Sequence, residues 1–184
     1  MKIITPSQWL ADLVGKSILK DYPVEVRHNT IDTNVFKPTP SDFRKRYGVD
    51  NRFMILGVAF PWTDRKGLSD FVKLAGELDF EKYAIVLVGL SDNQIEKLPE
   101  GIVGLIRTAP REELAGIYST ADVLFNPTAE DNFPTVNLEA EACGTPVVTY
   151  DTGGCSETLN DGNSRVVNGR IEALLAIKAM SERE

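Results

Sequence analysis

The chain alternates short runs of apolar, β-forming residues with longer runs of helix-forming residues almost to its end. Several of the apolar runs are uninterrupted, such as Met54-Ile55-Leu56 and Ile85-Val86-Leu87-Val88. Uninterrupted apolar strands are typical of parallel sheets that are covered on both faces. The alternation therefore predicts an α/β fold built on a doubly wound, Rossmann-like parallel sheet.

The same pattern gives approximate bounds for each element. We expect strands at residues 2–5, 24–28, 53–59, 84–89, 102–107, 122–126, 146–150 and 164–167. We expect helices at residues 7–19, 41–47, 68–78, 92–98, 111–120 and 134–143, a short turn at 156–159, and a last helix from 171 onward. Ligands of such sheets bind beyond the carboxyl ends of the strands. Five polar loops follow predicted strand ends and should share that edge: residues 60–67, 89–92, 107–111, 128–134 and 151–157.

Composition limits the kinds of partner. A length of 184 residues fits one domain, residues 1–184, and no apolar run approaches the ~20 residues that span a bilayer. The net charge of −7 argues against nucleic acid and against anionic membrane surfaces as main partners. An anionic ligand must therefore be held by local donors, because the overall field repels it.

No metal site is expected. His28 is the single histidine, which excludes any two-histidine site, and Cys143 and Cys155 lie in separate elements without metal-ligand spacing. Two reduced thiols are the simpler interpretation of the cysteines.

The segment from Asn126 to Ala140 carries the strongest functional signal. A strand ends, an acidic loop with Glu130 and Asp131 follows, and Pro134 opens a helix. The free amides and the dipole at such a helix start favour an anion. Glu139, one turn further in, suits sugar or ribose hydroxyls. As alternatives, Asp131 or Asn132 could merely cap the helix, and Glu139 could be a plain surface carboxylate.

Three other loops offer weaker candidates at the same edge. Arg65 and Lys66 could hold phosphate or could form a solvated basic turn. Arg107 and Thr108 could contact a flat base, although a capping arrangement for the following helix is equally consistent. The paired glycines Gly153 and Gly154 permit a close approach of the backbone to a ligand, or simply a tight turn.

These residues as a set resemble the C-terminal, donor-binding half of a GT-B retaining glycosyltransferase of family 4, also called group 1. The resemblance runs from about Ile4 to Val167, and as a set its motifs are highly specific. The segments that carry it are Thr5-Pro6-Ser7-Gln8-Trp9-Leu10, Asn29-Thr30-Ile31-Asp32-Thr33 through Phe36-Lys37-Pro38, Arg65-Lys66-Gly67, Pro110-Arg111-Glu112-Glu113-Leu114, Ala121-Asp122-Val123 and Leu138-Glu139-Ala140 through Cys143-Gly144-Thr145-Pro146-Val147. The segment Glu130-Asp131-Asn132-Phe133-Pro134-Thr135 is most similar to the corresponding segment of a bacterial branch of the family that is involved in surface-polysaccharide synthesis.

The resemblance implies a UDP-, GDP- or ADP-sugar donor and no metal or other cofactor. Glu139 would hold the ribose, Lys66 and the amides near Thr135 the diphosphate, and Arg107 with Thr108 the base. The loop of Glu130, Asp131, Asn132, Phe133 and Pro134 would meet the donor sugar, with Gly153 and Gly154 lining the same pocket. Glu130, Asp131 and Lys66 are then the catalytic candidates, and positive groups would stabilise the leaving diphosphate.

Three departures from the family pattern stand out. The family's acidic pair is two glutamates with seven residues between them; here Asp131 and Glu130 compete for the first position. The usual glycine-arginine after the first strand is absent around residues 57–61, where Arg65 could substitute. Glu141 stands where a bulky apolar residue is common.

The resemblance also implies that a complete enzyme needs an N-terminal acceptor-binding domain, which this chain lacks. We expect the chain alone to be inactive and cytoplasmic, with any contact to the inner face of the membrane made through that domain. The alternatives are a stand-alone nucleotide-sugar binding module without catalysis, or a GT-B relative that epimerises or phosphorolyses sugars; for the latter, no extra acid–base set or pyridoxal lysine site is evident.

Overall fold

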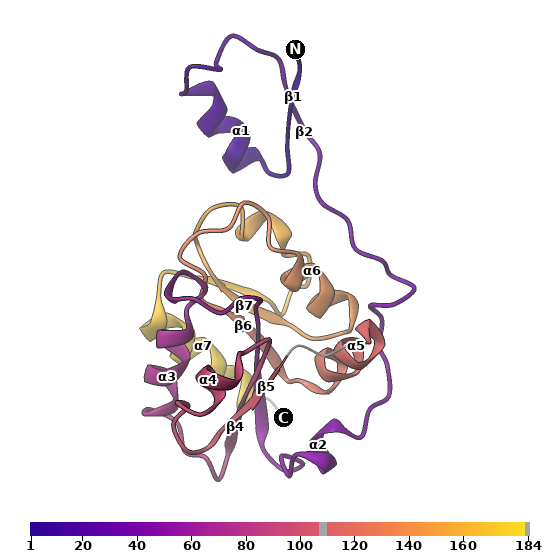
Figure 1. Cartoon of the computed structure of the whole chain (residues 1–184), viewed down its shortest axis with the longest axis vertical. Helices are drawn as coiled ribbons and strands as arrows, with labels where there is room; N and C mark the ends of the chain where they lie inside the picture. The colour runs from indigo at the N-terminus through magenta and orange to yellow at the C-terminus, as the bar shows by residue number, and fades with distance from the viewer. Residues whose placement is uncertain (107–109, 183–184) are drawn as a thin grey trace.

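The computed structural model describes residues 1–106 and 110–182, and its main body is a six-stranded parallel sheet (Figure 1). The order across the sheet is β5-β4-β3-β6-β7-β8, and every neighbouring pair is parallel. The strands are β3 (Phe53–Val58), β4 (Tyr83–Val88), β5 (Ile102–Leu105), β6 (Val123–Asn126), β7 (Val147–Tyr150) and β8 (Arg165–Val167). This arrangement confirms the predicted doubly wound fold.

The strand order reverses between β3 and β6. From β3 the chain builds outward through β4 and β5, and it then returns to place β6 on the other side of β3. The connections on either side of this switch point diverge, which leaves a crevice beyond the carboxyl ends of β3 and β6. The loops that follow β3, β4 and β6 contribute residues to this crevice.

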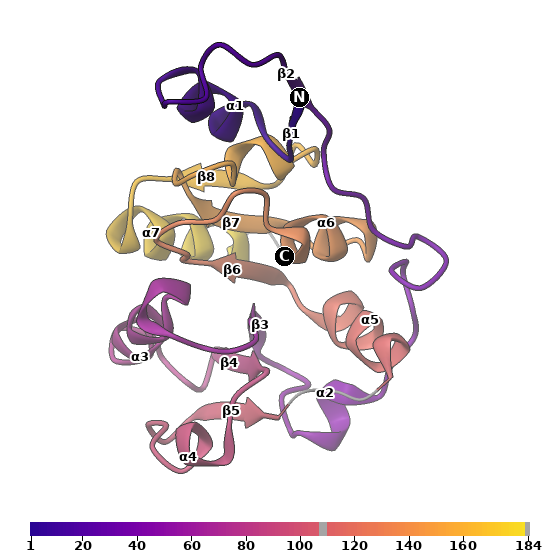
Figure 2. The same ribbon diagram turned by 45° about the horizontal axis from the view of Figure 1, so that its top comes forward.

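Helices cover both faces of the sheet (Figure 2). One core joins the sheet to α3 and α7 through Phe71, Leu74 and Ile177, and the opposite core joins it to α2, α5 and α6 through Phe43, Tyr118 and Ala140. Burial on both faces explains why β4 is apolar throughout. The helices are α2 (Phe43–Arg46), α3 (Leu68–Ala75), α4 (Asp92–Ile95), α5 (Arg111–Thr120), α6 (Thr135–Ala142) and α7 (Arg170–Ser181).

The first two strands form a separate unit above the main body (Figure 1). β1 (Ile3–Thr5) pairs only with β2 (Val24–Val26) among the described strands, and α1 (Gln8–Gly15) lies between them in sequence. The Glu157 carboxylate ties this unit to the main body by accepting hydrogen bonds from the Gln8 and Trp9 amides at 2.7 and 2.8 Å. The local sequence pattern predicts both strands but not which strand each one pairs with, because strand pairing depends on the tertiary fold.

Several element bounds differ from the sequence-based expectation. The first helix ends at Gly15 instead of residue 19, because the chain turns there through Lys16 and Ser17. Residues 64–66 form a short 3₁₀ helix, η1 (Asp64–Lys66), and a second one, η2 (Ser156–Thr158), lies at the expected turn. Pro134 precedes α6 as its N-cap residue and is not the first helical residue. None of the described helices is long and apolar enough to cross a membrane.

A substitution at Gly57 in β3 tests how tightly the central strand is packed. A Cβ atom on Gly57 would lie 2.5 Å from the Phe71 ring and 2.7 Å from the Leu87 side chain, both fully buried. We expect Gly57→Ala to lower the free energy of unfolding by about 1–3 kcal/mol, the usual effect of overpacking a core. Gly162→Ala is the control, because its Cβ meets nothing within 4 Å. Urea denaturation of both variants measures the difference; equal stabilities would contradict this account of the core.

Candidate functional site

Two adjoining hollows lie at the switch point of the sheet and form one groove. They share Val58 at the end of β3, Ala59 and Phe60 directly after it, and Val136 in α6. We call them the Glu139 hollow, with a volume of about 260 Å³, and the Asp131 hollow, with a volume of about 220 Å³. The groove therefore runs beside the first turns of α6, from one acidic side chain to the other.

The Glu139 hollow combines a half-buried carboxylate with a cation and apolar walls. Glu139 Oε2 accepts a hydrogen bond of 3.0 Å from the hydroxyl of fully buried Tyr118. Burial raises the pKa of Glu139, and the Tyr118 hydrogen bond and the Arg111 charge partly oppose this effect. Arg111 lies over the Phe36 ring, 5.3 Å from its centre, and both residues line the hollow. Glu139 is thus part of a wall and not a plain surface carboxylate.

The Asp131 hollow contains an ion pair. Lys66 Nζ lies 2.5 Å from Asp131 Oδ2, and both side chains are largely buried. Asp131 Oδ1 accepts a bond of 3.2 Å from the Phe133 amide. Glu130 is exposed and does not line either hollow. Of the two acidic candidates, Asp131 is therefore the one that lies in the groove.

The acidic loop is held from behind by glycines. Cβ atoms on Gly153 and Gly154 would lie only 2.0 and 2.1 Å from the carbonyl oxygens of Asp131 and Asn132. The Gly154 amide donates to the Asp131 carbonyl at 2.9 Å. Only glycines allow these two backbones to approach so closely. The pair supports the loop but does not line either hollow.

A ring stack holds the same loop from the side of the N-terminal unit. The His28 ring stacks on Phe133, with ring centres 4.8 Å apart and planes inclined by 18°. His28 Nδ1 lies 2.9 Å from the Pro6 carbonyl oxygen, which can only accept, so Nδ1 carries a proton. His28 therefore links the β1–β2 unit to the acidic loop.

The remaining predicted residues fall into three groups. Phe133, Pro134 and Thr135 line the Asp131 hollow. The side chains of Asn132 and Arg65 are exposed, and the Arg65 carbonyl accepts a bond from the Ala129 amide. The expectation that Arg65 replaces the missing arginine after the first strand therefore has no support in the geometry. Arg107 and Thr108 lie outside the described residues.

Sequence reasoning did not assign a site role to several residues of the groove. The sequence presents Arg111 as part of a motif and as a helix start, although a charge directly after a strand-end loop is a usable signal of a site. Tyr118 lies two turns after Arg111 on the same helix. An apolar residue would pack equally well at that position, so the sequence gives no signal that the Tyr118 hydroxyl has a role in the site. Phe36 lines the groove from a segment distant in sequence, and Asn126 lines it as the last residue of β6.

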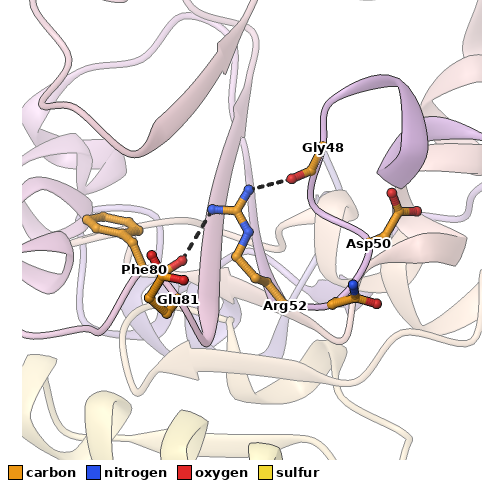
Figure 3. A pocket seen from close by; sticks show the side chains of 6 residues that line it. Gly48, Asp50, Arg52, Phe80 and Glu81 are labelled. Atoms are coloured by element: carbon orange, nitrogen blue, oxygen red, sulfur yellow. Dashed lines mark hydrogen bonds between the residues drawn. The ribbon is translucent and has the colours of Figure 1, made fainter.

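Two features outside the groove have structural roles. Figure 3 shows a polar depression at the amino ends of β3 and β4, where the Arg52 guanidinium donates to the carbonyl oxygens of Gly48 and Phe80. These bonds tie two loops together at the sheet edge opposite the groove. Glu141, one of the departures from the family pattern, accepts bonds from the Asn160 and Asp161 amides and from the Ser164 hydroxyl. It anchors a loop instead of disturbing the core.

The burial of Glu139 predicts a particular dependence of stability on pH. Its pKa is higher in the folded chain than its ordinary value of 4.5, so the folded state binds more protons above that pH. The free energy of unfolding contributed by this group therefore falls as the pH rises from 4.5 through the raised value. Glu139→Gln keeps an acceptor for Tyr118 but removes the charge.

We expect Glu139→Gln to be more stable than wild type at pH 7, with a difference that disappears below about pH 4.5. Urea denaturation across this pH range measures it. A wild type that is the more stable protein at pH 7 would contradict the assigned cost of burying the charge.

The glycine support of the acidic loop can be separated from backbone strain. Gly153 and Gly48 have similar φ angles of +59° and +64°, but a Cβ on Gly48 meets nothing within 4 Å. Gly48→Ala should cost about 1–2 kcal/mol from strain alone. Gly153→Ala should cost at least about 1 kcal/mol more, because it also forces the loop away. Faster hydrogen exchange at the Gly154 amide should accompany the loss, and equal costs for the two variants would argue against the support.

Comparison with known proteins assigns the chain to a family. The family described as Glycosyl transferases group 1 matches residues 42–180, most of the chain. A D-inositol 3-phosphate glycosyltransferase of Corynebacterium jeikeium is 34% identical over 137 residues, covering 66% of this chain and 33% of the relative. An alpha-galactosylglucosyldiacylglycerol synthase of Streptococcus pneumoniae is 26% identical over 190 residues, covering 95% and 50%. The chain thus spans about a third to a half of the length of these two curated relatives.

Solved structures share the fold. Anabaena HepE in complex with UDP-glucose has a TM-score of 0.81 at 23% identity, over 98% of this chain and 54% of its own. Sucrose-phosphate synthase from Thermosynechococcus elongatus has a TM-score of 0.83 at 22% identity, over 97% and 48%. At these identities the likeness shows the fold, a Rossmann-like half of the GT-B architecture. On the match of residues 42–180, the chain belongs to the group 1 glycosyltransferase family.

Proposed function

We propose that this chain binds the nucleotide-diphosphate-sugar donor of a retaining glycosyltransferase. One observation carries the proposal: a single groove at the switch point joins the Glu139 carboxylate to the Lys66–Asp131 pair along the start of α6. A nucleotide sugar needs both kinds of group, one for ribose hydroxyls and one for phosphate. The family membership and the UDP-glucose complex of HepE support the same assignment.

The nucleoside end of the ligand belongs in the Glu139 hollow. A carboxylate accepts hydrogen bonds from ribose hydroxyls, as acidic residues do in other dinucleotide-binding sheets. Tyr118 fixes the position of Glu139, because its hydroxyl donates to Oε2. Phe36, Val58 and Leu114 supply apolar surface beside this carboxylate.

The diphosphate belongs beside the first turn of α6. The amides of Thr135 and Val136 are free of helical partners there, and the helix dipole favours negative charge. Lys66 adds a full positive charge in a molecule whose net charge is −7. When the glycosidic bond breaks, negative charge grows on the leaving diphosphate, and these fixed donors stabilise it without a metal ion.

The Asp131 carboxylate is an ion-pair partner of Lys66 and would compete with a phosphate for it. An incoming phosphate would share or replace this partner, and Asp131 would then be available to sugar hydroxyls. This role for Asp131, together with transfer to a glycan or lipid-linked acceptor in bacterial surface-polysaccharide synthesis, is part of the proposal. So are a cytoplasmic location and an acceptor-binding domain that completes the active site.

Titration calorimetry of the 184-residue chain with UDP, GDP, ADP and UDP-sugars tests the donor site. We expect at least one nucleoside diphosphate to bind, and Glu139→Ala to weaken it by roughly 1–3 kcal/mol, the range for losing a charged hydrogen-bond partner. Glu130→Ala is the matched control and should bind normally, because Glu130 is exposed outside the groove. A folded chain that binds none of these ligands would exclude the proposal.

The alternative is a stand-alone nucleotide-sugar binding module. It makes the same binding prediction but differs in turnover. Sugar transfer or slow donor hydrolysis by the longest natural form of the protein, lost in Lys66→Ala, favours the enzyme. Tight donor binding by that form without any turnover favours the module.

A further inference from the structure

A row of buried polar side chains lies directly beneath the Asp131 hollow. Asn126 Nδ2 donates to Asn137 Oδ1 at 2.9 Å, and Asn137 Nδ2 donates to Thr158 Oγ1 at 2.8 Å. Thr158 Oγ1 donates to the Cys155 carbonyl oxygen at 2.6 Å. Asn137 and Thr158 are fully buried, and Asn126 is 8% exposed. The row runs from the η2 segment through α6 to the end of β6.

The direction of every hydrogen bond in this row is fixed from its buried end. The Cys155 carbonyl can only accept, so the Thr158 hydroxyl must donate to it. The Thr158 oxygen is then left to accept from the Asn137 NH₂ group, which turns the Asn137 carbonyl toward Asn126. Asn126 must present its NH₂ group in return. The carbonyl oxygen, Oδ1 of Asn126, is therefore the atom left over at the end of the row.

That oxygen reaches the groove. Asn126 lines the Asp131 hollow, together with Lys66, Asp131 and Thr135. Oδ1 has no hydrogen bond to any described residue, and no buried side-chain oxygen or nitrogen among these residues lacks a partner. Oδ1 is thus at the surface, and the surface beside Asn126 is the hollow. Three buried side chains fix one acceptor there.

The chemistry of this acceptor selects its ligand. Phosphate oxygens carry lone pairs and negative charge and would be repelled by a carbonyl oxygen, whereas a hydroxyl can donate to it. Asp131 offers a second acceptor in the same hollow. A pair of fixed acceptors beside one cation suits neighbouring hydroxyl groups of a sugar that is joined to a phosphate.

We propose that Asn126 is a specificity-determining residue whose Oδ1 accepts a hydrogen bond from one hydroxyl of the donor sugar. This inference rests on the proposed donor-binding function. Asn137 and Thr158 act as positioning residues, because they fix which end of the Asn126 amide faces the hollow. A purely structural network would stabilise the fold equally well but would not distinguish a nucleotide sugar from its nucleotide.

The double variant Asn126→Leu/Asn137→Leu tests the contact. Replacing both partners of a buried hydrogen bond by apolar groups of similar shape is far less disruptive than replacing one. Thr158 keeps its bond to the Cys155 carbonyl in this variant. Thr158→Val tests the positioning role, because it removes the acceptor that fixes the Asn137 amide and leaves the Asn126 side chain in place.

Affinities are measured for a nucleoside diphosphate and for its glucose conjugate, in the UDP, GDP or ADP series that wild type binds best. We expect wild type to bind the conjugate more tightly. In the double variant the nucleoside diphosphate should bind as in wild type, and the conjugate should lose about tenfold, the effect of one net hydrogen bond. Thr158→Val should also bind the nucleoside diphosphate as wild type does, but it should lose part of the conjugate's advantage, because the Asn126 amide is no longer held with Oδ1 toward the hollow.

Conjugates that each lack one sugar hydroxyl identify the donor of the bond. In wild type one of them should bind about tenfold more weakly than the intact conjugate, and the double variant should not distinguish the two. The proposal is overturned if wild type gains nothing from the sugar, or if the double variant weakens both ligands equally. If wild type binds no nucleotide in any series, the proposed function itself falls. Those results are distinguishable.

Discussion

The parallel pairing of β3 with β6 is the constraint on which the rest of the structure depends. It joins the two halves of the sheet at Ile55–Val123 and Leu56–Leu124, and the strand order reverses at this pair. The loops after β3 and β6 then diverge to opposite faces and cannot fill the space between them. The groove is therefore a consequence of topology, and side chains decide only what it can bind. Gly57 leaves room for the Phe71 ring and the Leu87 side chain to pack against β3.

Contacts within the protein hold the loop that borders the groove. Backbone contacts at Gly153 and Gly154, the stack of His28 on Phe133 and the Lys66–Asp131 pair hold it from three directions. A loop fixed in this way loses little conformational entropy on binding, which leaves more of the contact energy for affinity. The N-terminal unit takes part through His28 and through the Glu157 contact with α1. Movement of that unit relative to the main body would therefore shift the acidic loop.

The fold was predictable from sequence to a large extent, because burial on both faces of β3 and β4 leaves an unmistakable apolar pattern. The separation of β1 and β2 from the main sheet was not, since strand pairing has no local signature. Within the groove, the sequence predicts a ligand-binding role for Glu139 from its place one turn into a helix, and the structure places this carboxylate in the wall of the groove. The sequence does not decide between Glu130 and Asp131, because the side chains of adjacent loop residues differ only in the direction in which they point. That direction depends on Lys66 and on Gly153, which are far away in sequence. Asn126, Asn137 and Thr158 form one network only in space, so no spacing in the sequence indicates it.

Polar groups inside this core are concentrated at the edge where the groove lies. Burying the Glu139 charge and the amides of Asn126 and Asn137 has a cost that apolar side chains of similar size would avoid. Tyr118 and Thr158 reduce this cost by forming hydrogen bonds with these groups. Tyr118 also fixes the position of the Glu139 carboxylate, and Thr158 also fixes the orientation of the Asn137 and Asn126 amides. A network that is fully satisfied on its buried side can only direct its remaining groups outward. The groups that remain, a carboxylate at Glu139 and a carbonyl at Asn126, are both acceptors. Each hollow thus has an acceptor and a cation, and Val136 in the first turn of α6 is shared by both hollows; this arrangement suits the proposed ligand, which has hydroxyls at both ends and phosphate in the middle.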